Sequence, residues 1–119
     1  MYELDELKRA VVQLGSKGET GAILTFNLLP WITEFIALHP TLLPVYFTIH
    51  AVKPTEKLTD AYEVSDFETS LDGVLQWTVD ATDTEIAGRG FAEIYIIVVS
   101  EDMVDFALKL FPFHTYVSP

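Results

Sequence analysis

The sequence predicts one all-β domain, an antiparallel sandwich of about seven strands. Its 119 residues are the usual size of a single domain, and no linker, repeat or low-complexity tract divides residues 1–119. Half of the residues are hydrophobic, which is enough to build a core without disulfides or metal. Short runs of β-branched and aromatic residues alternate with turns roughly every 8–12 residues, as in a sandwich or barrel. The amphipathic helices that a parallel α/β fold places between its strands are missing.

The first residues fit two interpretations. Apolar residues recur at helical spacing at Leu4, Leu7, Val11 and Leu14. However, residues 10–14 followed by the glycine-rich residues 15–18 also read as a strand that runs into a turn. We expect a short helical or irregular arm that passes into a first strand near Arg9.

The next strand is predicted over residues 21–29. One of its faces is apolar and carries Ala22, Leu24, Phe26 and Leu28. Pro30 should end this strand, because proline cannot donate to a ladder. Residues 31–43 fit a helix and an extended segment equally well, and Pro40 and Pro44 require any helix there to be short.

Three strands are predicted most clearly, over residues 45–52, 74–79 and 91–99. A short strand is expected around residues 61–64, and a final strand or pair of strands over residues 103–113 and 115–117. In the second clear strand, Trp77 alternates in phase with Leu75 and Val79. We therefore place Trp77 in the core.

Charge and composition exclude several partners. Eighteen acidic residues against seven basic ones give a formal net charge of −11. Binding to nucleic acid requires clustered Lys and Arg, and only Lys8 and Arg9 are adjacent, so we predict no nucleic-acid partner. The first residues lack the layout of a signal peptide, and no apolar run approaches the roughly 20 residues that span a bilayer. We expect a soluble chain made in a cytoplasm, with no membrane insertion.

No arrangement of residues indicates catalysis. The chain has no cysteine, and His39, His50 and His114 do not have the spacing of metal ligands. No serine lies in a nucleophile elbow, and no glycine-rich phosphate loop is present. We predict a protein that is not an enzyme and that holds no cofactor or metal.

One acidic loop has two interpretations. Asp80, Asp83 and Glu85 are close in sequence and could together bind Ca²⁺, which prefers oxygen ligands. Their spacing is not that of an EF-hand. The alternative is a solvated loop in which Asp83 or Thr84 closes a local turn.

Four segments carry a family resemblance. Residues 18–26, 49–54, 73–79 and 83–94, in this order, resemble the immunoglobulin-like N-terminal domain of bacteriophage baseplate, tail and fibre proteins, of the upper-baseplate-protein type. The resemblance implies an immunoglobulin-like sandwich. It also implies a structural or adaptor protein of the virion, made in the host cytoplasm, that binds other virion proteins and copies of itself. Residues 31–43 and 103–106 depart from the family pattern, as expected if they are adapted to a particular neighbour.

Apolar residues in excess of the core's needs indicate where partners bind. Exposed apolar patches usually mark interfaces, and we predict one from Trp31, Ile32, Phe35, Ile36, Leu38, Phe106, Leu108, Phe111 and Phe113. A rival hypothesis is a carbohydrate-binding module, with Ca²⁺ as an aid to binding, that would use exposed aromatic residues such as Trp31 and the acids of residues 80–85.

Overall fold

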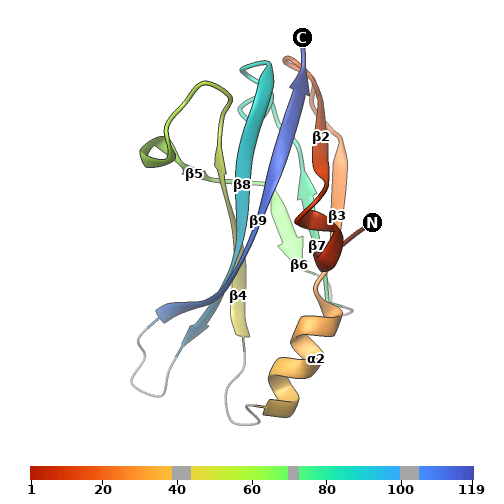
Figure 1. Ribbon diagram of the computed structural model, residues 1–119, viewed down its shortest axis with the longest axis vertical. Coiled ribbons are helices and arrows are strands. Elements are labelled where there is room, and N and C mark those ends of the chain that lie inside the picture. The colour runs from red at the N-terminus through yellow and green to blue at the C-terminus, as the bar shows by residue number, and fades with distance from the viewer. Residues whose placement is uncertain (39–43, 70–72, 100–104) are drawn as a thin grey trace.

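Two β-sheets lie face to face, with a helix at one end of the sandwich (Figure 1). The computed structural model describes residues 1–38, 44–69, 73–99 and 105–119. Within these ranges only the backbone is described at residues 36, 44–46, 97–99 and 105–110. The predicted all-β sandwich is confirmed at this level.

The first sheet has the strand order β1-β3-β7-β6. Its strands are β1 (Tyr2–Glu3), β3 (Ile23–Asn27), β6 (Phe67–Thr69) and β7 (Val74–Thr78). Leu24 of β3 lies opposite Trp77 of β7, and both side chains are buried. Trp77 is fully buried, so its predicted place in the core is confirmed.

The second sheet has the strand order β2-β9-β8-β4-β5. Its strands are β2 (Val11–Ser16), β4 (Pro44–Val52), β5 (Tyr62–Glu63), β8 (Gly88–Val99) and β9 (Asp105–Ser118). The predicted strands at residues 45–52 and 91–99 correspond to β4 and β8. The short 3₁₀ helix η1 (Leu58–Asp60) precedes β5.

The sheets are mixed, which corrects the prediction of a purely antiparallel sandwich. β1 pairs with β3 in parallel, and β2 pairs with β9 in parallel. Strands joined by a tight turn in one sheet must be antiparallel. The glycine turn after β2 instead carries the chain across to the other sheet, so β2 is free to pair with the last strand.

The end of the chain forms one strand instead of two. β9 continues through Pro112, which lies opposite Glu93 of β8. On the other side of β9, pairing with β2 begins only at His114. Proline is therefore tolerated here, because at Pro112 there is no ladder with β2 to interrupt.

The sequence of residues 31–43 fits a helix and an extended segment equally well, and in the structure residues 31–38 are helical. The helix α2 (Leu29–Leu38) begins two residues after β3 ends. Pro30 lies in its first turn, where a missing N–H costs nothing, so Pro30 belongs to a helix start and does not end a strand. Residues 39–43 lie outside the described residues.

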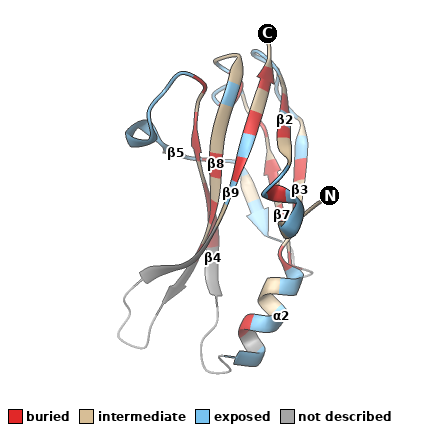
Figure 2. Ribbon diagram, in the orientation of Figure 1, coloured by how far each residue is buried: buried red, intermediate tan, exposed pale blue. Residues whose placement is uncertain are grey.

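The core lies between the two sheets and continues under the N-terminal arm (Figure 2). The arm includes the short helix α1 (Leu4–Leu7), and Leu7 of this helix is fully buried in the core. The arm, which was expected to be short and either helical or irregular, is thus helical over Leu4–Leu7. Among the described residues, no helix is long and apolar enough to cross a membrane.

Candidate functional site

The acidic loop that follows β7 is built around one buried carboxylate. Asp83 is only 3% exposed. Its Oδ2 accepts hydrogen bonds from Trp77 Nε1 at 3.1 Å and from the Asp80 backbone N–H at 2.9 Å, and its Oδ1 accepts one from the Tyr62 hydroxyl at 2.6 Å. Burial, together with the hydrogen bond to Asp83, raises the pKa of Tyr62. Such a network lets a carboxylate lie inside a protein.

The other two acids of this loop are also used by the fold. Asp80 Oδ1 accepts the backbone N–H of Thr82 at 2.8 Å, which forms a local turn. Glu85 Oε2 lies 2.7 Å from Lys53 Nζ. This ion pair lowers the pKa of Glu85 and raises that of Lys53.

The hypothesis of a calcium site at Asp80, Asp83 and Glu85 is therefore not supported by their geometry. In the part of the chain that the structure describes, no three acidic, histidine or cysteine side chains are grouped so that they could hold a metal ion. A local turn is present, as the alternative interpretation expected. However, Asp83 is buried, whereas that interpretation placed it in solvent.

A groove of about 580 Å³ lies between α1, the first turns of α2 and β9. It lies next to the start of β2, where the first pair between β2 and β9 joins Val11 to His114, and α1, which precedes β2, also contacts β9. The apolar lining consists of Leu4, Leu7, Pro30, Trp31, Phe111 and Pro112. The charged lining consists of Glu3, Asp5, Lys8 and Glu34.

One asparagine fixes both walls of this groove. Asn27 Nδ2 donates to the Glu3 carboxylate at 3.0 and 3.3 Å, and Asn27 Oδ1 accepts the backbone N–H of Leu29 at 3.1 Å. The N-terminal arm is thus tied to the start of α2. Gly73 adds a second restraint: its φ is +77°, and a Cβ there would lie 3.1 Å from the Leu29 Cα. Only glycine fits this close approach in the left-handed region.

The structure brings two of the predicted interface residues together. Trp31 and Phe111 are far apart in the sequence, and both line the groove half-buried. The Trp31 ring stacks on Phe35, with centroids 4.9 Å apart and the planes at 15°. The Trp31 ring thus packs on Phe35 and also contributes aromatic surface to the groove lining.

The other predicted interface residues have different environments. Ile32 is partly buried against the core, and Leu38 is 67% exposed at the end of α2. Phe35 and Phe113 are buried, so they are not surface residues as predicted. Phe113 lies opposite Ala92, and its ring centroid is 5.4 Å from that of Phe26. The side chains of Ile36, Phe106 and Leu108 lie outside the described residues.

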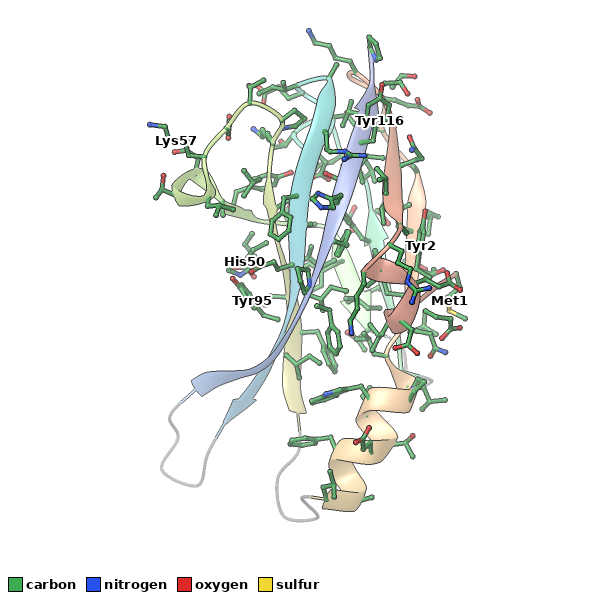
Figure 3. The ribbon with its side chains drawn as sticks, viewed as in Figure 1. Met1, Tyr2, His50, Lys57, Tyr95 and Tyr116 are labelled. Atoms are coloured by element: carbon green, nitrogen blue, oxygen red, sulfur yellow. The ribbon has the colours of Figure 1, made fainter. Side chains whose placement is uncertain are left out.

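A second surface feature lies on the outer face of the five-stranded sheet. The His50 and Tyr95 rings meet edge to face with centroids 4.5 Å apart, and the Tyr95 hydroxyl donates to Glu93 Oε2 at 2.7 Å (Figure 3). These side chains, with Phe91 and Leu58, line a shallow hollow of about 210 Å³. Leu58 is 73% exposed at its edge.

Sequence reasoning missed most of this outer hollow and the charged lining of the groove. The alternation of Phe91, Glu93 and Tyr95 along β8 is a signal that could have found the hollow, because alternate residues share one face.

No protein-family model matches the chain, and no curated protein matches it significantly.

Proposed function

We propose that this chain is a non-catalytic β-sandwich subunit that acts by binding other proteins in a larger assembly, in particular a bacteriophage particle. The observation that carries the proposal is the groove that brings Trp31 and Phe111 together over an apolar lining. Aromatic residues, tryptophan above all, dominate the binding energy of protein interfaces. A half-buried tryptophan that stacks on Phe35 and lines a concave site suits that role.

An immunoglobulin-like topology is part of this proposal. The order β3-β7-β6 in one sheet and β9-β8-β4 in the other corresponds to strands BED and GFC of that fold. β5 next to β4 then takes the place of an added strand of the variable type. Departures from the antibody pattern include the parallel pairing of β1 with β3, the position of the buried Trp77 on β7, which corresponds to strand E, and the absence of cysteine.

The virion role is tested by the composition of particles. We expect peptides of this chain in purified phage particles from lysates of the source organism, at a ratio to other virion proteins that stays constant through repeated purification. Mass spectrometry measures both. If the chain is found only in the soluble fraction of the lysate, the virion role is wrong.

The role of the groove is tested separately. If copies of the chain or a virion neighbour bind through it, sedimentation velocity should show a complex that Trp31→Ala weakens. Glu63→Lys, an exposed change on β5, is the control and should leave the complex intact. A complex that is equally stable in the Trp31→Ala variant would place the interface elsewhere.

Glycan binding is a second candidate, favoured by the outer hollow. Its Phe91 and Tyr95 rings could stack on a sugar, while His50 and Glu93 could bind hydroxyl groups. This location replaces Trp31 and the acids of residues 80–85, which the rival hypothesis had named. A glycan array read with the unaltered chain and with Tyr95→Ala is the test. Binding that survives this substitution, or no binding at all, would refute the candidate.

A further inference from the structure

The groove between α1, α2 and β9 combines an apolar interior with acidic walls. Trp31 and Phe111 provide aromatic surface, while Asp5 on α1 and Glu34 on α2 are both exposed beside it. An apolar surface favours burial of apolar side chains. Carboxylates at its edge favour cations among them.

Among the described residues, neither of these wall carboxylates forms an ion pair with a basic side chain. Within the described residues, the ion pair present joins Lys53 to Glu85, and neither Asp5 nor Glu34 takes part in one. Lys8 is the one basic residue among the four charged residues of the lining. The formal net charge of −11 adds to the negative potential around the groove.

We infer that this groove binds a segment of a partner protein in which apolar side chains alternate with lysine or arginine. The inference rests on the proposed assembly function and specifies the partner. An apolar side chain would lie between Trp31 and Phe111, and a basic one near Asp5 or Glu34. A second copy of this chain carries the same charge of −11, so charge complementarity favours a different protein as the occupant.

The size of the groove agrees with a short segment. Its volume of about 580 Å³ is within the roughly 300–1,000 Å³ of sites that enclose small ligands. A site of this size accommodates a few side chains, whereas a flat face between two domains has no such concavity. Exposed carboxylates on α1 and α2, two of the elements that line the groove, allow more than one basic residue beside an apolar anchor.

A displayed library of short random peptides tests the inference on the full chain. We expect the unaltered protein to enrich peptides that contain both apolar and basic residues. Calorimetry on a synthesised winner should then show about 30-fold weaker binding to Trp31→Ala. Glu34→Lys should weaken it about tenfold, and added salt should reduce the difference between this variant and the unaltered chain.

The charge-reversed variant gives the sharpest comparison. A second selection against Glu34→Lys should enrich peptides that are less basic than those selected by the unaltered chain. Glu63→Lys makes the same change of charge on β5, which is outside the groove lining and at the opposite edge of its sheet from β2, and should select the original peptides. Circular dichroism spectra and urea denaturation show that each variant is folded.

The outcomes distinguish this inference from the proposed function. If Trp31→Ala abolishes binding but the selected peptides carry no basic preference, the groove is an interface and the partner chemistry is wrong. If binding is indifferent to Trp31→Ala, both the groove and the inference are wrong. If no peptide is enriched, a linear segment is not the occupant, and the particle composition still decides the virion role.

Discussion

Two acidic regions of this molecule use their carboxylates in opposite ways. In the loop after β7, Asp83 is buried and accepts three hydrogen bonds from the protein itself. At the groove, Asp5 and Glu34 are exposed beside apolar surface and form no ion pair within the described residues. A carboxylate whose hydrogen bonds are made internally stabilises the fold. One that stays exposed beside an apolar groove is available to a partner.

Among the substitutions that test this difference, Asp83→Ala should reduce the stability of the fold most. The substitution leaves the Trp77 Nε1–H, the Tyr62 hydroxyl and the Asp80 N–H without their acceptor, and each such loss costs about 1–3 kcal/mol where the donor stays buried. We expect the free energy of unfolding in urea to fall by at least about 3 kcal/mol. Asp66→Ala, in an exposed position, is the control and should change it by less than about 0.5 kcal/mol. Equal effects would mean that Asp83 is not structural.

A smaller effect is expected for Tyr62→Phe, which removes one donor from the same network. Near neutral pH the loss should be about 1 kcal/mol. Because the pKa of Tyr62 is raised in the folded state, its contribution is complete below its ordinary pKa of 10.0 and is lost as the pH rises above it. Urea denaturation at increasing pH should therefore show the unaltered chain losing stability more steeply in alkali than the variant. Parallel curves would contradict this role.

Trp31→Ala should affect stability less than Asp83→Ala, although it removes a large side chain. Trp31 is half-buried in the groove lining and stacks on Phe35, so we expect a loss of about 1–2 kcal/mol. The effect on binding should be far larger than the effect on stability. A loss of stability as large as that of Asp83→Ala would show that Trp31 serves the core more than the groove.

The smallest effect is expected for Glu85→Gln, at the exposed end of the acidic loop. The pKa of Glu85 is lowered by Lys53, so the pair stabilises the fold above the ordinary Glu85 pKa of 4.5, and this contribution disappears as the pH falls through the lowered value. The pKa of Lys53 is raised, so the lysine keeps its charge across neutral pH. In urea denaturation, the free energy of unfolding of the unaltered protein and that of Glu85→Gln should differ slightly at neutral pH and not at all in acid. A difference that persists in acid would point to another cause.

The sequence by itself determined the strands whose side chains alternate or form continuous apolar runs. β7 shows this most clearly, because Leu75 and Trp77 occupy alternate positions and their burial follows from the two-residue period of a strand. Local pattern was also enough to place α1 and β2. The aromatic residues of the groove could be named from their excess over the needs of a core, although which of them stay at the surface could not.

Only the tertiary structure decided which elements meet. Phe113 was predicted to be exposed, but it lies opposite the small Ala92 and packs on Phe26, and this depends on the register between β8 and β9. Asp83 is buried because β5 and β7 bring Tyr62 and Trp77 to it. The groove exists because β2 begins only at the level of His114, so that α1 lies beside the preceding part of β9. Pairing between distant segments has no local signature in the sequence, and for this reason neither the buried carboxylate nor the groove could be read from the residues alone.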